Sequence, residues 1–447
     1  MDPPGVNSSL RVFARLWGLA AVAHVIGNFA QPDLPTAVGL VNLAVGLTGI
    51  WLVAVPRRTV LLGLASLIVV SLVLEMPITG NHWLLAGLVS AAILVTGAKE
   101  NELFPTARWI LLAFYSFAAF AKINTGFFDP DVSCAVFFAN QNLGSWGLPV
   151  IAADGNLARL AIWATAAIEL AVVPLLLLRR TRYWGVVLGS SFHVLISFDL
   201  AQHFYDFTAV LLPLFALFLP NTMLGTFRLA PAVLTDLVKR VLALVAVGAS
   251  VLLVVMASLP LTEWSFRLLT LVPFLLWIPF VLLWLRWLIR LRPQPFAVGW
   301  RTGLGGAVVV ALALANGFTP YTEIKTAYGY NMYANLVTAQ GESNHLLIPR
   351  TWPLRNGYEG PVEIVSSNDP GLLSYRDAGY RIAYPQFQRY LAANRGVDVT
   401  YLRKGVEIHV DDSATTHSGP WWWRFLPLRS LDIQAPPRCQ DVFLPAL

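Results

Sequence analysis

A single lysine stands out in the segment FYSFAAFAKINTGFFDPDVS, residues 114–133. The residues before Lys122 are almost all apolar, and turn residues with two aspartates, Asp129 and Asp131, follow it. An ionisable group within a membrane span is costly unless it reaches the headgroups, pairs with a partner or lines a cavity. Lys122 therefore either closes a membrane helix and extends to the headgroups, or serves as a buried proton-transfer group.

Further polar side chains lie near the ends of other apolar segments. Asn81 and His82 open the segment NHWLLAGL, and His193 lies near the end of GSSFHVLISFDL. Glu169 lies within another apolar segment, and the loop beyond His193 contains Asp199, His203 and Asp206. If the segments cross a membrane in alternating directions, the histidines reach the same depth as Lys122. The pattern predicts a shared polar cavity, although a single intramembrane histidine can equally be structural.

Such a cavity would change the chemistry of Lys122. Desolvation penalises the charged ammonium, and a neutral amine in a dry site is a competent general base. A nearby carboxylate would oppose this effect, so Asp129 and Asp131 would have to face water. A hydroquinone would suit such a base, because its phenol is weakly acidic and its lipid tail lets it enter from the bilayer.

The composition is that of a polytopic membrane protein. Of the 447 residues, 56% are hydrophobic and only 13% are charged, whereas soluble domains carry about a quarter charged residues. A helix needs roughly 20 apolar residues to cross the hydrocarbon. About eleven runs approach this length, at 11–30, 36–55, 59–77, 82–98, 106–122, 157–178, 183–198, 205–220, 239–259, 264–289 and 300–318.

Basic residues indicate the orientation of these spans. Loops on the side of the N-terminus hold most of the arginines and lysines, and the opposite loops hold almost none. By the positive-inside rule the N-terminus is cytoplasmic, and an odd number of spans places the C-terminus outside. The net charge of +6 comes from these loops, so no nucleic-acid partner is needed to explain it.

We predict three regions and an all-α membrane bundle with a small C-terminal extracytoplasmic α+β domain. Residues 1–220 carry most intramembrane polar groups, residues 221–318 add further spans, and residues 319–447 form the α+β domain. In that domain NHLLIPR, GPVEIVSSND and DVTYLRKGVEIHVDD are typical of strands. YPQFQRYLAANRG is typical of a helix with a glycine stop. GPWWWRFLPL is either an interfacial aromatic element or part of the domain core.

The chain contains two cysteines, Cys134 and Cys439. The predicted topology places both outside, where disulfides persist, so they either pair or remain two free thiols. A pair would attach the C-terminal end of the chain to the loop after Lys122. The sequence contains no C-x-x-C pattern, and no metal site is predicted.

At these residues the chain resembles the vitamin K-dependent γ-carboxylase superfamily, specifically its bacterial branch, the HTTM (horizontally transferred transmembrane) domain proteins. The likeness rests on YSFAAFAKINTGFFDPDVS, GNHWLLAGL and the stretch from IELAVVPLLLLRR to LISFDLAQHF. The resemblance implies that Lys122 deprotonates vitamin K hydroquinone and that His82 and His193 complete the catalytic set. The predicted substrate- or cofactor-binding residues are Asn81, Glu169, Asp199 and His203.

The resemblance also implies a function. It predicts a quinone-dependent carboxylase and epoxidase, of the carbon–carbon lyase class, in a bacterial inner membrane. Its cofactor would be a menaquinol-type hydroquinone used with O2 and CO2, and its partners a membrane lipid or quinone and a secreted protein or peptide. The alternatives are a non-enzymatic lipid-binding or assembly protein, a transporter, and a haem or quinone electron carrier that uses His24 and His193.

Overall fold

A computed structural model describes residues 8–28, 36–77, 79–229, 263–355, 357–413 and 419–440. The described residues form two compact units. The first lies within Met1–Leu74, His82–Leu112 and Ala171–Val310, and the second lies within Glu75–Asn81, Ala113–Leu170 and Ala311–Leu447. The second unit thus combines the C-terminal region with helical segments that precede it in the sequence.

Helices occupy the predicted apolar runs wherever the structure describes them; the run 239–259 lies outside the described residues. Six described helices, or parts of them, are long and apolar enough to cross a membrane, as expected for an integral membrane protein. The number of eleven spans stays a prediction. The helices at the predicted runs are α1 Ser8–Asn28, α2 Thr36–Ala54, α3 Arg58–Glu75, α4 Asn81–Val95, α5 Glu100–Ala121, α8 Asn156–Leu177, α9 Arg182–Ile196, α10 Phe204–Ala216, α13 Glu263–Arg290 and α14 Leu304–Phe318.

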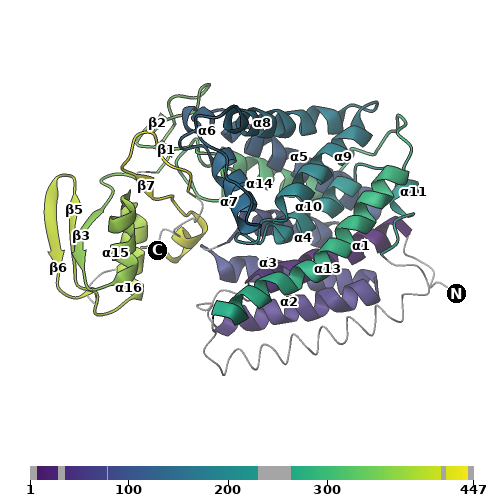
Figure 1. The fold of residues 1–447 in the computed structure, drawn as a ribbon. Helices are drawn as coiled ribbons and strands as arrows, with labels where there is room; N and C mark the ends of the chain where they lie inside the picture. Colours follow the sequence, from purple (N-terminus) through teal and green to yellow (C-terminus); the bar gives the residue numbers. More distant parts are fainter. Residues whose placement is uncertain are drawn as a thin grey trace. The chain divides into compact units, whose positions relative to one another are not determined.

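Helices α1 and α2 of the first unit pack with close backbone contact (Figure 1). A Cβ atom on Gly18 would lie 2.6 Å from the carbonyl oxygen of Gly49, and a Cβ on Gly49 would lie 2.8 Å from that of Gly18. Small residues at such positions allow apolar helices to approach closely and gain van der Waals contact. The two glycines therefore allow the backbones of α1 and α2 to approach closely.

Helix α10 is the interior helix of the first unit. Each of its residues from Phe204 to Ala216 is buried, as expected for a helix that is apolar on all sides. Helices α1 and α9 pack against it. Polar groups on α10 therefore face protein rather than solvent.

The C-terminal region of the second unit contains a three-stranded antiparallel sheet in the order β3–β5–β6. Its strands are β3 Glu363–Ser367, β5 Val399–Arg403 and β6 Val406–Val410. Helices α15 Pro370–Ala378 and α16 Tyr384–Ala393 share an apolar core with it, which includes Phe387 and Tyr401 (Figure 1). Three of the predicted elements are confirmed: the β3 strand, the β5–β6 hairpin and the α16 helix with a glycine, Gly396, at positive φ.

The prediction of a strand in NHLLIPR is wrong. Within this segment His345 forms an isolated bridge to Asn124, and Arg350 forms one to Glu342. The backbone N–H of Leu346 donates to Ile123 O at 2.9 Å. The segment thus makes isolated bridges to the turn after α5 and to Glu342, and no continuous strand ladder. The short strands nearby are β1 Thr338–Ala339 and β2 Glu342–Ser343, and β4 Tyr380–Arg381 pairs with β7 Leu431–Asp432.

The segment GPWWWRFLPL forms a short 3-10 helix, η3 Trp421–Phe425. Trp421 is 77% exposed, so it is not part of a domain core. Arg424 donates to the carbonyl oxygen of Met76 at 2.7 Å, and the guanidinium of Arg355 lies 4.8 Å from the ring of Trp423. The element is thus attached to the chain that directly follows α3.

Of the two alternatives that the sequence left open for the cysteines, the structure shows the disulfide, which links Cys134 with Cys439. Cys134 is the first residue of α7 Cys134–Ser145, and its backbone N–H donates to Asn335 Oδ1 at 2.8 Å. Both cysteines belong to the second unit. The disulfide therefore holds a residue close to the C-terminus against the segment that follows Lys122.

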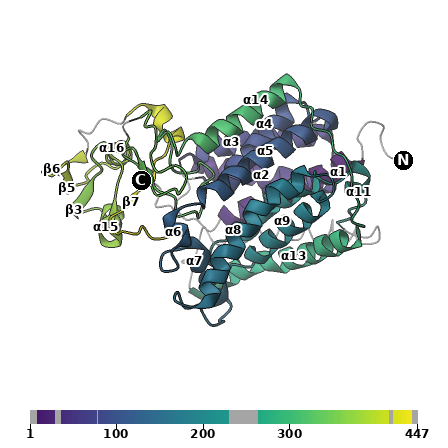
Figure 2. The ribbon, with the colours of Figure 1, turned by 90° about the horizontal axis from the view of Figure 1, so that it is seen from above.

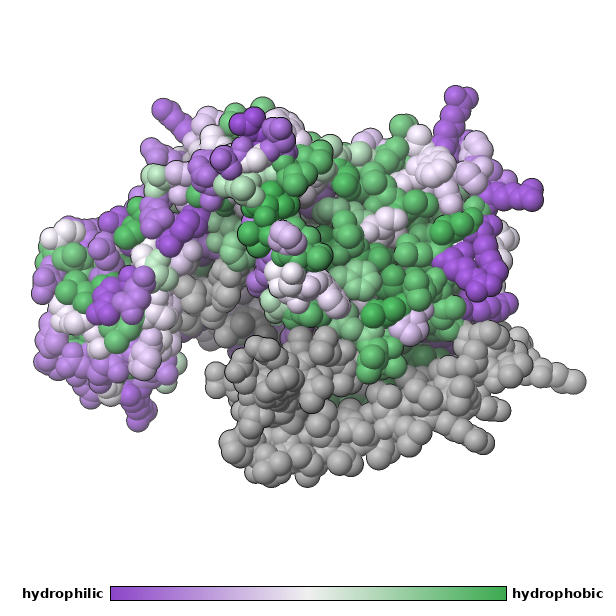
Figure 3. All heavy atoms as spheres, viewed as in Figure 1, coloured by the Kyte–Doolittle hydropathy of each residue, from purple (hydrophilic) through white to green (hydrophobic). Residues whose placement is uncertain are grey.

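Apolar side chains are exposed along many helices. Large side chains such as Leu195, Leu282 and Ile289 are more than half exposed, and green apolar residues dominate the visible helical surface in Figure 3. Around the strands of the C-terminal region the surface in the same figure is mainly purple. Exposed apolar area on this scale is typical of helices that face lipid.

Two buried polar clusters as candidate functional sites

The backbone around Lys122 is fixed by Asn124. Its side chain accepts the N–H of Phe127 at 2.8 Å and caps the short helix α6 Thr125–Phe128. It also donates to the carbonyl oxygens of Ala121 and Ala334. Asn124 is fully buried, so the turn that follows α5 is held in one conformation. Figure 2 shows α6 and α7 beside the start of α8, where Phe127 and Ile162 share an apolar cluster.

Lys122 forms an ion pair with Glu169 of α8. Their atoms Nζ and Oε2 are 2.8 Å apart, and the two side chains are only 9% and 12% exposed. Oε2 takes part in no hydrogen bond of regular geometry within the described structure, so it can still accept a proton from a third group. Nζ lies 5.9 Å from the ring centre of Phe127, and Tyr115 lies close enough to Glu169 to interact electrostatically.

This geometry corrects one expectation from the sequence. The neutral, unpaired lysine proposed there requires that carboxylates stay away from Nζ, and Glu169 is in direct contact with it. Asp131 is exposed, as expected. Lys122 is therefore neither extended into solvent nor an isolated amine: it is half of a buried ammonium–carboxylate pair.

The second cluster joins three helices of the first unit. His24 of α1 and His82 of α4 both contact Asp206 of α10, with distances of 3.0 Å from Nδ1 and 2.7 Å from Nε2 to the same oxygen, Oδ2. The ring of His24 stacks on Trp83 with a centroid distance of 3.4 Å. Among the described residues the other oxygen of Asp206, Oδ1, is buried without a hydrogen-bond partner.

Asp206 corrects a second expectation, since the sequence placed it in a loop. It lies in the first turn of α10 and is 5% exposed. Helix α10 begins at Phe204, directly after His203, whose positive φ of 52° ends the preceding turn. The carboxylate therefore faces the interior of the helical unit.

His193 lies near His82 but not in the His24–His82–Asp206 cluster. The ring of Phe207 is 5.0 Å from the ring of His193 and 5.9 Å from that of His82. His82 and His193 thus both lie close to the ring of Phe207. These are two of the residues that the sequence predicted to share a cavity. Lys122 and Glu169 belong to the second unit, and His82 and His193 to the first.

The predicted binding residues Asp199 and His203 take part in the turn between α9 and α10. Asp199 Oδ1 accepts the backbone N–H groups of Ala201 and Gln202. Burial raises the pKa of Asp199 and lowers that of His203. The contacts of Asp199 are those of a residue that stabilises a turn.

Asn81 connects the start of α4 with the C-terminal region. Its Oδ1 accepts the backbone N–H of Tyr330 at 3.0 Å. The ring of Tyr330 in turn packs edge-on against Phe114 of α5 at 5.0 Å. In the described part of the chain Asn81 Nδ2 is buried and has no hydrogen-bond partner, so this amide can still donate one.

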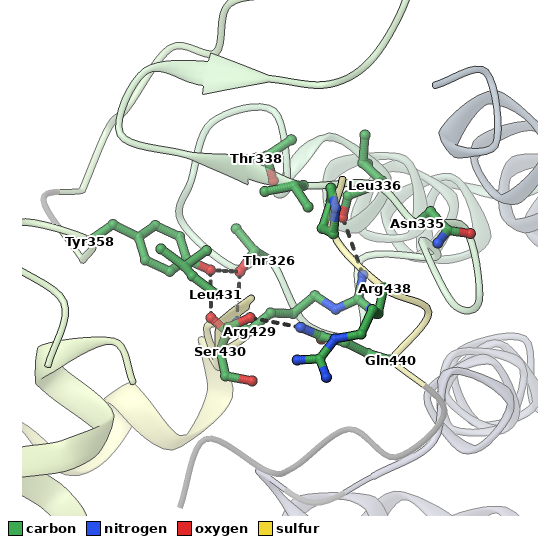
Figure 4. A pocket seen from close by; sticks show the side chains of 12 residues that line it. Thr326, Asn335, Leu336, Thr338, Tyr358, Arg429, Ser430, Leu431, Arg438 and Gln440 are labelled. Carbon is green, nitrogen blue, oxygen red and sulfur yellow. Dashed lines mark hydrogen bonds between the residues drawn. The ribbon is translucent and has the colours of Figure 1, made fainter. Parts of the chain in front are cut away.

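A pocket in the C-terminal region is bounded by polar groups that bind each other (Figure 4). The hydroxyl of Tyr358 contacts Thr326 and donates to Arg429 O. Arg438 is held by Asp432 at 2.8 Å. Burial raises the pKa of Tyr358 and lowers that of Arg429 to about 10. The arrangement is typical of a polar network that stabilises the fold.

Sequence reasoning named Lys122 and Glu169 but did not group His24 with Asp206. These two are 182 residues apart, and Asp206 and His82 are 124 apart. The available signal was the rarity of ionisable groups within apolar helices. Comparison of the chain with protein-family models, with curated proteins and with solved structures gives no match.

Proposed function

We propose that this chain is an integral membrane enzyme of the vitamin K-dependent γ-carboxylase-like type, which removes a proton from a lipid-soluble hydroquinone at the Lys122–Glu169 pair. The observation that carries the proposal is this buried ion pair, whose atoms are 2.8 Å apart. The enzyme would lie in a bacterial inner membrane, with the pair towards the outer leaflet and the C-terminal region outside. The sequence resemblance supplies the substrate class.

The pair can accept a proton without creating net charge. A phenol placed beside it loses its proton to the carboxylate of Glu169, and the phenolate that remains lies next to the ammonium of Lys122. The group of three has a net charge of zero before and after this transfer. In a medium of low dielectric constant, this balance avoids the cost of an isolated charge.

The same products form if Lys122 acts as the base. The ammonium first gives its proton to Glu169, and the neutral amine then takes the phenol proton. Both routes end with a phenolate, an ammonium and a protonated glutamic acid. The ion pair is therefore compatible with the role of Lys122 as base that the resemblance implies.

Neighbouring side chains would keep the step dry and oriented. Phe127 is fully buried next to Nζ, and Tyr115 is buried near Glu169. Exclusion of water strengthens the attraction between ammonium and phenolate. By analogy with the family, the phenolate then reacts with O2, and the strong base that results drives addition of CO2 to an acceptor.

Turnover of menaquinol tests the proposal. Purified protein in lipid nanodiscs receives menaquinol, O2 and CO2, and the quinone epoxide is measured by mass spectrometry. Loss of general acid–base catalysis lowers rates by about 10²–10⁴-fold, so Lys122→Ala and Glu169→Gln should each fall in this range. Lys99 pairs with Glu102 at 3.7 Å and is 61% exposed, so Lys99→Ala is a matched control that keeps the wild-type rate.

The possible results separate the proposal from its alternative. Unchanged epoxide formation in folded Lys122→Ala and Glu169→Gln would remove the pair from the mechanism. Wild-type protein that retains a bound lipid or quinone through purification but forms no epoxide would favour the non-enzymatic lipid-binding function.

A further inference from the structure

We propose that His24, His82 and Asp206 form a binding site for a divalent transition-metal ion. The three residues come from three helices of the first unit, and the site does not depend on the Lys122–Glu169 pair. No metal was expected from the sequence, because its patterns contain no local ligand motif. The inference rests on the geometry, the charge and the surroundings of the cluster.

The donor atoms converge on one point. His24 Nδ1 and His82 Nε2 lie 3.0 and 2.7 Å from the same oxygen, Asp206 Oδ2, and the ligand atoms of the three residues all lie within 4.8 Å of one another. Metal–nitrogen and metal–oxygen bonds of about 2.0–2.2 Å place neighbouring ligand atoms roughly 3 Å apart. The two observed distances are close to this value.

A simple hydrogen-bond network would use the carboxylate differently. Two imidazole donors can bind the two oxygens of a carboxylate separately, which satisfies both oxygens. In the described structure both rings approach Oδ2, and Oδ1 is buried without a hydrogen-bond partner. Convergence of three ligands and one unused oxygen suits a coordination site, since the second oxygen can also bind the ion.

The charge of the cluster also favours a cation. Asp206 is 5% exposed and His24 is 2% exposed. With neutral imidazoles the cluster carries one negative charge in the interior of an apolar helical unit. Buried charges in proteins are paired or coordinate metals, and a divalent ion would supply the missing positive charge.

The donor set limits the class of metal. Two imidazoles and one carboxylate suit ions such as Fe²⁺, Zn²⁺, Co²⁺ or Mn²⁺ rather than Ca²⁺ or Mg²⁺, which prefer oxygen. Three protein ligands leave at least one coordination position open, as in catalytic rather than purely structural sites. Trp83, stacked on His24 at 3.4 Å, fixes the orientation of that ligand.

A second group of three possible metal ligands could bind metal in the experiment and has to be eliminated by mutation. Asp398, His409 and Asp411 lie close together in the C-terminal region, and all three are exposed. Exposed acidic side chains lie together in many proteins without binding a metal, so this trio supports no proposal. Its histidine could nevertheless bind added metal, so the experiment uses the His409→Ala background.

The experiment is a titration of metal-free protein with Co²⁺. The full chain, with a purification tag that contains no histidine, is treated with chelator and titrated while its visible d–d absorption is recorded. We expect one Co²⁺ per chain, displaced by Zn²⁺. Loss of a ligand should weaken binding by at least the 10–100-fold typical of outer-shell changes, so His24→Ala and Asp206→Asn should both show this loss.

Matched variants make the result specific. His193→Ala, which leaves the three ligands in place, and Lys99→Ala, which changes an exposed side chain, should both bind Co²⁺ like the background protein; loss of binding in either would contradict the site. Folded background protein that binds no Co²⁺ would also overturn the proposal, as would binding that survives both ligand changes. If the ligand variants do not fold, X-ray absorption on the Co²⁺ form of the background protein decides: absence of two imidazole ligands refutes the site.

Discussion

The two units bury charge in different ways. In the second unit Lys122 and Glu169 form a balanced pair, and the chain around them is held by Asn124 and by the Cys134–Cys439 disulfide. In the first unit one carboxylate, Asp206, contacts two imidazoles, and no cysteine cross-links the helices. The balanced pair can exchange a proton without a change in net charge, whereas for the His24–His82–Asp206 cluster we propose a bound cation.

A second lysine of the second unit sharpens the contrast. Lys325, in the chain after α14, is 4% exposed, and its ammonium contacts the amide oxygen of Asn316. An amide oxygen accepts a hydrogen bond but carries no compensating charge. Burial accordingly lowers the pKa of Lys325 to about 7. Two buried lysines of one unit thus differ in whether a carboxylate contacts them.

The largest effect is expected from breaking the balanced pair. Removal of one partner of a buried ion pair costs about 3–5 kcal/mol, because the other charge is left uncompensated. Glu169→Gln should therefore lower the thermal unfolding temperature strongly. The double variant Lys122→Met with Glu169→Met should recover most of the loss, since no buried charge remains. Thermal unfolding in lipid nanodiscs measures both.

An exposed ion pair provides the control for these single and double variants of Lys122 and Glu169. Lys99 and Glu102 are 61% and 35% exposed, and pairs of this kind contribute about 0–1 kcal/mol. Their single and double variants should leave the unfolding temperature nearly unchanged. A Glu169→Gln protein as stable as the wild type would mean that Lys122 reaches water, which contradicts the burial on which the proposed mechanism depends.

A smaller effect is expected from the helix contact in the first unit. Gly18→Ala would place a methyl group 2.6 Å from Gly49 O, and this atom belongs to backbone that cannot rotate away. Overpacking of this kind costs about 1–3 kcal/mol. Gly63→Ala is the matched control, because nothing lies within 4 Å of a Cβ at that exposed helical position. Equal stability of the two variants would show that α1 and α2 are less closely packed.

The positions of the helices could be predicted because apolar length is a property of local sequence. Lys122 and Glu169 could be named as site residues for the same reason, since an ionisable side chain is conspicuous in an apolar run. Their mutual contact could not be predicted, because the sequence does not fix which faces of α5 and α8 meet. For this reason the expectation that Lys122 has no carboxylate partner was wrong: Glu169 of α8 contacts it.

The C-terminal region shows the same limit. The β5–β6 hairpin could be predicted from alternating side chains around the Lys404–Gly405 turn, both of which have positive φ. The segment NHLLIPR has a similar apolar pattern but binds the turn after α5 through Leu346. Its conformation depends on residues more than 200 positions away, which local patterns do not contain.

The smallest effect is a dependence of stability on pH that arises from Lys325. In the unfolded chain a lysine has a pKa of about 10.4, and burial lowers the folded value to about 7. Between these values the unfolded state binds a proton that the folded state lacks, so stability rises with pH. From pH 6.5 to 8.5 the rise should be about 2 kcal/mol, measured as a higher unfolding temperature.

The variant Lys325→Met isolates this contribution, because it keeps the length of the side chain and removes the titrating group. The difference in unfolding temperature between Lys325→Met and wild type should be largest at pH 6.5, where the folded wild type must hold a buried ammonium, and should shrink towards pH 8.5. Parallel curves for wild type and Lys325→Met would show that Lys325 is hydrated, and the contrast between the two lysines would then fail.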